Sequence, residues 1–363
     1  MAAGEFAHAH PALAGFWHPV AWSDEVGNEP VAAGLLGQGW VLARFGDDLS
    51  AFADACPHRR ARLSAGVLTD GTLQCPYHGW RFGNDGRCVQ IPALEASAPI
   101  PPRAALRPAA GIAERDGLVW LAPSAPRAGP PDLSVPAGLS GDRVATARLP
   151  VVHVAANAAV MVDNFLDEAH LPFVHAATIG GAGPEPIPRA EVVRDGLGFT
   201  AVREHTFTNR TDPAVLDGTR PAVQRRRMTY RYQAPLTATL LLEYLDAGSW
   251  QFLTFTAAPD HEPAAPAAPA DPAGPARASG SSCRVYRTIT GPGLADPELA
   301  ESTVKYEMTV FEEDLDLQRR ALSGLEFPLD ISAELHTRAD RVSVEFRRVL
   351  AEAIGSPRPA KTD

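Results

Sequence analysis

Apolar and polar residues alternate over short stretches in the first third of the chain, and this pattern predicts β-strands. Residues 31–36 and 40–45 are two such stretches, and Gly37 and Gly39 between them indicate a hairpin. Asp-Gly pairs mark further turns at residues 70–71, 85–86 and 116–117. From residue 15 to residue 125 the pattern therefore predicts a small all-β domain.

The second half of the chain mixes helical and strand-like patterns. Residues from Val160 to about Ala169 recur with helical spacing, and Pro172 disfavours helical geometry at Leu171, where we expect the helix to bend or end. Strand-like runs follow, and two amphipathic patterns then predict helices near the C-terminus. The runs lie between residues 191 and 290, and the two helices span residues 297–322 and 331–354. These elements predict a second domain of mixed α and β structure.

Two stretches rich in proline, alanine and glycine interrupt these patterns. Residues 126–142 separate the all-β domain from the second domain, which we place at residues 143–356. Residues 258–282 contain too few large apolar side chains to order themselves, and they predict a disordered surface loop within the second domain.

Composition narrows the classes of function. The 363 residues suffice for two domains with full cores. The formal net charge is −10, and acidic and basic residues are mixed along the chain, which argues against a surface for nucleic acid or anionic membrane. No apolar run approaches the length of a membrane span, and the N-terminus lacks the features of a secretory signal, so we expect a cytoplasmic location.

Two short segments of the all-β domain each combine a cysteine with a histidine, Cys56-Pro57-His58 and Cys75-Pro76-Tyr77-His78. A Rieske-type [2Fe–2S] cluster needs two cysteines on one iron and two histidines on the other. A Cys2His2 zinc site is the alternative, but a zinc finger places its cysteines together and its histidines on a helix. Each segment here is mixed and turns surround both, which favours the cluster.

A second group of candidate ligands lies in residues 164–175, where His170 and His175 are five residues apart and Asp167 precedes them. Two imidazoles and a carboxylate on one side of an iron form the facial triad of non-haem Fe(II) oxygenases. Taken alone, two histidines at this spacing are more often ordinary residues at a helix end. The cysteine–histidine pattern about a hundred residues earlier is what favours a metal site.

Together these motifs resemble the terminal oxygenase subunit of the Rieske non-haem iron oxygenases. The resemblance rests on residues 56–59, residues 75–80 and the spacing Asn164-x-x-Asp167-x-x-His170-x4-His175, and it extends over nearly the whole chain. It is greatest to the branch that includes dicamba and vanillate O-demethylases. The resemblance implies an α+β protein, in which an N-terminal all-β Rieske domain precedes a helix-grip catalytic domain with an antiparallel sheet and long C-terminal helices.

The same resemblance implies a role for each motif residue. Cys56, His58, Cys75 and His78 would hold the [2Fe–2S] cluster. His170 and His175 would bind a mononuclear Fe(II), and the third ligand would be an aspartate that follows a glutamate in the 297–322 helix. That position is Asp314, with Asp316 and Glu313 as alternatives.

Two more residues of the 164–175 segment receive roles from the resemblance. Asn164 would lie near the iron, and Asp167 would bridge a Rieske histidine of one subunit to an iron-binding histidine of the next, within a homotrimer.

No glycine-rich dinucleotide fingerprint or flavin site is present in the sequence, so we expect NAD(P)H to act only through a separate reductase, with or without a ferredoxin. The resemblance to the O-demethylase branch implies a reaction that uses O2 to monooxygenate a small, largely apolar molecule, by hydroxylation or by O- or N-demethylation. Aromatic-ring cis-dihydroxylation is the alternative, and an electron carrier without an active iron is a second one. No motif identifies the substrate.

Overall fold

The computed structural model describes residues 6, 8–139, 141–179, 186–209, 213–260, 281–322, 325 and 327–355. Contacts divide the chain into two compact units, one built mainly from residues 9–132 and the other mainly from residues 133–257 and 277–363. The change of unit after Asp132 falls inside the stretch expected to separate two domains. The domain bounds given above stay predictions.

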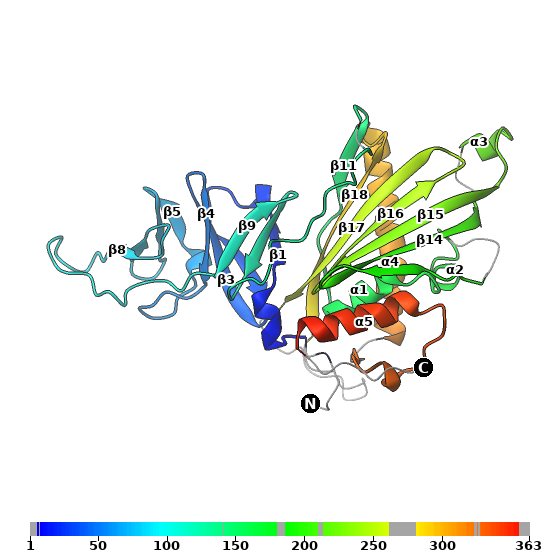
Figure 1. The fold of residues 1–363 in the computed structure, drawn as a ribbon. Helices are drawn as coiled ribbons and strands as arrows, with labels where there is room; N and C mark the ends of the chain where they lie inside the picture. The colour runs from blue at the N-terminus through cyan, green and yellow to red at the C-terminus, as the bar shows by residue number, and fades with distance from the viewer. Residues whose placement is uncertain are drawn as a thin grey trace. The chain divides into compact units, whose positions relative to one another are not determined.

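The N-terminal unit is built from three small antiparallel sheets with the orders β1-β10-β9, β2-β3-β4 and β5-β6-β7-β8 (Figure 1). The predicted hairpin is confirmed, because β2 and β3 pair through a turn at Leu36 and Gly37, both with positive φ. The strands are β1 (His18–Trp22), β2 (Val31–Leu35), β3 (Gln38–Phe45), β4 (Asp48–Ala53), β5 (Val67–Thr69), β6 (Thr72–Gln74), β7 (Arg81–Phe82), β8 (Cys88–Gln90), β9 (Gly111–Arg115) and β10 (Leu118–Ala122).

The second unit is built around one antiparallel sheet of eight strands, in the order β11-β18-β17-β16-β15-β14-β13 with β12 paired to β18. Its strands are β11 (Val144–Arg148), β12 (Val152–Val154), β13 (Glu191–Arg194), β14 (Gly198–Thr208), β15 (Val223–Gln233), β16 (Thr237–Tyr244), β17 (Ser249–Asp260) and β18 (Ser282–Pro292). The loop predicted at residues 258–282 therefore begins and ends in strands, and its residues 261–280 lie outside the described residues.

Helices α1, α4 and α5 lie against this sheet (Figure 1). Aromatic rings form the contacts: Phe165 of α1 stacks on Phe255 of β17, and Phe346 of α5 meets Tyr232 of β15 edge to face. These rings make the core between the sheet and its helices. The helices are α1 (Ala158–Leu166), α2 (Leu171–Val174), α3 (Pro213–Leu216), α4 (Pro297–Ala321) and α5 (Arg341–Ala353).

Two helix boundaries differ from the sequence prediction. Helix α1 ends at Leu166 rather than near Ala169, because the Asp167 side chain accepts hydrogen bonds from the N–H groups of Ala169 and His170 and turns the chain there. The helix predicted from residue 331 begins only at Arg341, after a single 3-10 turn at Ile331–Ala333. The helix predicted at 297–322 is confirmed as α4. Among the described residues, none of the helices is long and apolar enough to cross a membrane.

Candidate active site

The two cysteine–histidine loops, residues 56–61 and 75–80, share one backbone hydrogen-bonding pattern. In each loop the cysteine N–H donates to the carbonyl of the fifth residue after it, and the cysteine carbonyl accepts from the N–H of the fourth residue. That fourth residue is Arg60 in one loop and Gly79 in the other, with φ of 58° and 68°. The chain builds the same turn twice, and each turn fixes a thiol beside a histidine.

The side chains of these loops separate into a buried sulfur side and an exposed imidazole side. Cys56 and Cys75 are each 1% exposed, whereas His58 and His78 are exposed. The two imidazole rings meet edge to face with their centroids 4.5 Å apart, and Trp80 stacks on His58 at 4.8 Å. Two thiols therefore face the core and two imidazoles face outward.

This donor set fits a [2Fe–2S] cluster of Rieske type. Four ligands of a single tetrahedral zinc would lie within about 4 Å of one another. Among the described residues, however, three metal-binding atoms lie within 4.8 Å of one another only at His170, His175 and Asp314. Burial also raises the pKa of the Cys56 thiol to about 11, so a thiolate there needs the positive charge of a bound metal centre.

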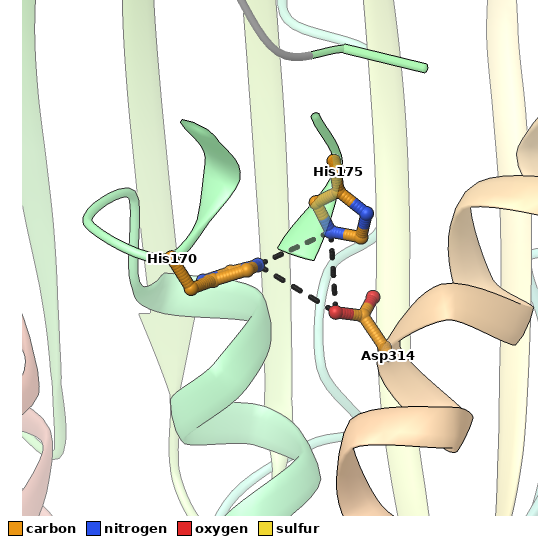
Figure 2. A group of neighbouring side chains, drawn as sticks. All are labelled: His170, His175 and Asp314. Atoms are coloured by element: carbon orange, nitrogen blue, oxygen red, sulfur yellow. Dashed lines mark hydrogen bonds and ion pairs between the residues drawn. The ribbon is translucent and has the colours of Figure 1, made fainter. Parts of the chain in front are cut away.

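The second candidate centre lies where α1, α2 and α4 meet the sheet. His170 and His175 flank the short helix α2, and Asp314 comes from the middle of α4. Figure 2 shows the three side chains pointing toward one another. The Nε2 atoms of the two histidines are 3.2 Å apart, and Asp314 Oδ1 lies 3.2 Å from His175 Nε2 and 3.6 Å from His170 Nε2. Two nitrogens and one oxygen thus converge on one point.

The geometry fits a bound Fe(II). Two imidazoles and one carboxylate are the ligands of the 2-His-1-carboxylate triad. Asp314 Oδ1 is buried and makes no hydrogen bond with any described residue, which would cost free energy unless a cation lies beside it. Of the two alternatives, Asp316 forms an ion pair with Arg320 at the surface, and Glu313 contacts the opposite nitrogen of the His175 ring.

Each histidine of the triad is held by a carboxylate at its other ring nitrogen. His170 Nδ1 donates to Asp167 Oδ2 at 2.9 Å, and His175 Nδ1 donates to Glu313 Oε2 at 2.8 Å. Thr178 Oγ1 donates to the same Glu313 oxygen at 2.7 Å. These contacts fix the tautomer that leaves both Nε2 atoms free to bind a metal. Burial lowers the pKa of His175, but Asp314 and Glu313 outweigh it, and the net pKa is raised.

A cavity of about 140 Å³ opens beside the triad. An apolar cavity of roughly this size holds one benzene ring. Asn164 and Asp167 also line it. Most of the lining is apolar and comes from α1, the sheet and α4, with Phe165, Met228, Tyr230, Leu240, Phe255 and Phe311 as its large side chains.

Sequence patterns did not reveal every residue of this site. The sequence predicts Glu313 only as an alternative ligand and not as the partner of His175, and Arg287 in the cavity wall carries no motif. Arg287 lies in a strand, β18, whose residues apart from Arg284 and Arg287 are mostly apolar or small. Charged residues are uncommon in such a strand, and this is the signal that points to Arg287.

Comparison with known families identifies the chain. The family model for the vanillate O-demethylase oxygenase C-terminal domain matches residues 154–356, and the model for the Rieske [2Fe-2S] domain matches residues 16–104. The chain belongs to the vanillate O-demethylase oxygenase family. It is a Rieske non-haem iron oxygenase, and its cofactors are a [2Fe–2S] cluster and a mononuclear iron.

Curated relatives of this oxygenase include two demethylases. Dicamba O-demethylase, oxygenase component, from Stenotrophomonas maltophilia is 34% identical over 186 residues, which cover 50% of this chain and 52% of that protein. Methylxanthine N3-demethylase NdmB from Pseudomonas putida is 27% identical over 365 residues, which cover 92% of this chain and 87% of that protein. The chain spans only 30% of another relative, chlorophyllide a oxygenase from rice.

Solved structures show the same fold. NdmA from Pseudomonas putida CBB5 with caffeine superimposes with a TM-score of 0.73 at 22% identity, over 98% of this chain and 99% of that one. The predicted α+β architecture of the oxygenase, with its antiparallel sheet and C-terminal helices, is confirmed.

Proposed function

We propose that this chain is the oxygenase component of a multicomponent monooxygenase that hydroxylates or demethylates a small, largely apolar molecule. The observation that carries the proposal is the convergence of His170, His175 and Asp314 at the wall of an apolar cavity. In the proposal these three residues bind Fe(II). Three protein ligands on one side leave its other positions open toward the cavity.

The proposed reaction inserts one atom of O2 into a substrate C–H bond and releases the other atom as water. It consumes two electrons and two protons, which the reductase and the solvent supply. When the target is an O- or N-methyl group, the hydroxymethyl product breaks down to formaldehyde and the demethylated substrate. Fe(II), when bound, supplies the O2 chemistry. The relatives named as dicamba O-demethylase and methylxanthine demethylases support demethylation.

The chain's own residues orient the reactants and exclude water. Asp167 and Glu313 hold the two imidazoles with Nε2 toward the cavity. Phe165 and Phe311 close the apolar walls against solvent, so that a substrate lies dry beside the triad. Asn164 lines the same cavity, and its amide offers a hydrogen bond beside the iron position.

Electrons enter, in this proposal, at a cluster held by Cys56, His58, Cys75 and His78. They come from a separate NAD(P)H-dependent reductase, directly or through a ferredoxin. The exposed imidazole side of the loops supports this entry route, because electron donors must approach closely. A cytoplasmic location completes the proposal, since none of the four cysteines, all of them among the described residues, forms a disulfide, which suits a reducing compartment.

Asp167 is proposed to link the two centres across a subunit boundary in a homotrimer. Its Oδ2 accepts from His170 Nδ1, and its Oδ1 accepts one N–H, from Ala169. A second lone pair of Oδ1 can therefore accept from a Rieske histidine of a neighbouring subunit. We predict that Asp167→Asn retains both metal centres and loses nearly all coupled turnover. Normal product formation per NAD(P)H in that variant would contradict the bridging role.

The deciding experiment is metal and sulfide analysis of chain purified without oxygen, followed by EPR of the reduced protein. The proposal predicts about three irons and two acid-labile sulfides per chain, with a Rieske signal.

Incubation with a generic reductase, ¹⁸O2 and methoxybenzenes should then place a single labelled oxygen in each product or release formaldehyde. Two labelled oxygens in one product would mean dihydroxylation instead. If the chain contains only two irons and shows no turnover after Fe(II) reconstitution, it acts as an electron carrier and not as an oxygenase.

A further inference from the structure

The turn between helices α1 and α2, residues 167–170, contains both His170 and the carboxylate that holds it, Asp167. Of these four residues only Glu168 is buried, and the other three are partly exposed. Glu168 Oε2 lies 2.8 Å from a terminal nitrogen of Arg203, and the two side chains are 7% and 4% exposed. The two adjacent carboxylates thus have different partners: Asp167 contacts the imidazole ring, and Glu168 contacts the sheet.

The sheet residue in this contact, Arg203, has a fixed backbone. It lies in β14, and all eleven residues of that strand pair with β15. Opposite it in the register is Met228, which lines the cavity beside the triad. Because the hydrogen bonds between the strands hold β14 in place, Arg203 gives the 167–170 turn a firm point of attachment.

Stability alone does not explain the buried pair of Arg203 and Glu168. Removing two charges from water is costly, and well-packed apolar residues in place of a buried ion pair are often as stabilising or more so. Arg203 is also incompletely satisfied, because its Nε is buried and has no hydrogen-bond partner among the described residues. A role that buried ion pairs do have in some proteins is to select one geometry over others.

The two histidines of the triad differ in how firmly they are held. The His175 side chain is 2% exposed, and the Glu313 oxygen behind it also accepts a hydrogen bond from Thr178. The His170 side chain is 14% exposed, and the carboxylate at its Nδ1 belongs to the same short turn. A shift of that turn would therefore move His170 and Asp167 together. Displacements of about 1 Å are enough to impair a site of this kind.

We propose that Arg203 is a positioning residue of the iron site. Through its ion pair with Glu168 it holds the 167–170 turn against β14, and the turn holds His170 Nε2 where the three ligands of the triad converge. The proposal rests on the proposed function in one respect, namely that the triad binds Fe(II). Arg203 itself contacts neither metal nor substrate in this role.

The test is the Fe(II) affinity of the full chain, measured without oxygen by competition with a chelator of known affinity. Arg203→Met should bind Fe(II) about 10- to 100-fold more weakly, as is usual when the support behind a metal ligand is lost. Electrostatics alone predicts the opposite sign, because removing a cation near bound Fe(II) would strengthen its binding. Arg203→Lys keeps the charge and should recover part of the affinity. Unchanged or tighter binding in Arg203→Met would overturn the proposal.

Arg347→Met is the matched control, because Arg347 is also buried and pairs with a carboxylate, Asp163, at 2.9 Å. At a temperature at which both variants are folded, it should keep the original Fe(II) affinity. Equal weakening in both variants would mean that the loss of any buried pair disturbs the triad, and the specific role of Arg203 would be wrong. If Arg203→Met does not fold, Arg203→Lys should bind Fe(II) more weakly than Arg347→Lys, and equal affinities would overturn the proposal.

A spectrum of the Co(II)-loaded chain separates positioning from stability. The EPR signal of high-spin Co(II), recorded at saturating metal with the cluster oxidised, reports the geometry of the ligands and not the stability of the fold. The signal should change in Arg203→Met and stay the same in Arg347→Met. Weaker Fe(II) binding with an unchanged Co(II) signal would mean that Arg203 acts only on stability, and the proposal would be wrong.

Metal binding and turnover report on different claims. Suppose that the original chain forms no O2-dependent product with methoxybenzenes but Arg203→Met binds Fe(II) more weakly and alters the Co(II) signal. The positioning role would then be upheld and the proposed oxygenase function contradicted. Product formation by the original chain, with unchanged Fe(II) affinity in Arg203→Met, would do the reverse.

Discussion

Single residues around the triad control how its ligands are presented. Glu313 is the least expected of them, because it neighbours Asp314 in sequence yet serves the opposite side of the His175 ring. Its carboxylate is shared with Thr178, and the pair holds one imidazole tautomer. Sequence alone offered Glu313 only as a rival ligand, since a motif records spacing and not the direction in which a side chain points.

We predict that Glu313→Gln weakens Fe(II) binding by about 10- to 100-fold, as is usual when a carboxylate behind a metal-binding histidine is removed. The amide of the substituted side chain can still contact His175 Nδ1, but it has no negative charge to hold the N–H tautomer at that nitrogen. Competition with a chelator of known affinity measures the effect, and the cluster spectrum should stay unchanged. Glu312→Gln is the matched control, because Glu312 is exposed and pairs with Arg319. Equal Fe(II) affinity in both variants would contradict the role.

His18 in the N-terminal unit predicts a pH dependence of stability. Burial lowers the pKa of His18 to about 4, although its Nε2–H donates to the Leu13 carbonyl at 2.9 Å. The unfolded chain, with a histidine pKa near 6.5, takes up the proton first as pH falls. The free energy of unfolding should therefore drop between about pH 6.5 and pH 4, by up to about 1.4 kcal/mol per pH unit.

The contribution of His18 is measured by difference. In His18→Gln the amide can still donate to Leu13 but does not titrate, so calorimetric scans from pH 7.5 to pH 5 should show a shallower loss of stability. His153→Gln, which changes an exposed histidine, should keep the original slope. If both variants follow the original chain, His18 is not the titrating group.

At the scale of elements, one helix organises the site and one ion-pair network joins two helices. Helix α4 was predictable over its full length, because its apolar and acidic residues repeat at helical spacing. The end of α1 was not predictable, because the Asp167 side chain that caps it acts through hydrogen bonds that spacing does not record. The late start of α5 has the same kind of cause, because the Asp340 side chain accepts hydrogen bonds from the N–H and the hydroxyl of Thr337 just before the helix begins.

Arg347 of α5 binds Asp163 of α1 and Glu334, each at 2.9 Å, and is 4% exposed. We predict that Arg347→Met lowers the free energy of unfolding by about 3 kcal/mol, because Asp163 keeps a buried charge without its cation. Arg348→Met removes a half-buried arginine from the same helix, whose ion pair with Glu345 is long at 3.6 Å, and should change stability by less than about 1 kcal/mol. Denaturant unfolding with helix-sensitive detection compares the two.

A second substitution tests the cause of that loss. Asp163→Asn combined with Arg347→Met removes the stranded charge and should recover part of the stability. A double variant as unstable as the sum of both single variants would mean that the lost contact of Arg347, whose guanidinium lies over the Phe327 ring, is responsible instead.

At the scale of the whole molecule, the sequence was sufficient to predict both metal centres but not their environment. The expected cysteine and histidine ligands stand in short motifs, so their spacing along the chain points to them directly. Asp314 lies in no motif, and the sequence left Asp316 and Glu313 as alternatives to it. The wall of the cavity is assembled from short groups of residues in α1, α2, α4 and four strands, and these groups lie far apart in the sequence. No local pattern connects Arg287 to His170, and only the fold brings them to one cavity.

The proposed homotrimer makes a prediction that a monomer cannot satisfy. If electrons pass from the cluster of one subunit to the iron of the next, two inactive variants should restore activity when they assemble together. Cys75→Ser lacks a cluster ligand, and His175→Ala lacks an iron ligand. The two variants are co-expressed in equal amounts and assemble as a head-to-tail ring. A subunit with an intact cluster then donates to a neighbour with an intact iron site at roughly one subunit contact in four. Roughly a quarter of the original turnover is therefore expected.

The measurement is product formation by the co-expressed mixture, purified at the mass of three 38.6 kDa chains by light scattering. Each variant assembled alone is the control and should be inactive, because every subunit lacks the same centre. If electrons instead moved within one chain, no mixed assembly could work, since each subunit would lack either the donor or the acceptor. If the co-expressed mixture is as inactive as each variant alone, electrons move within one subunit. Asp167 then has no role in transfer to a neighbouring subunit.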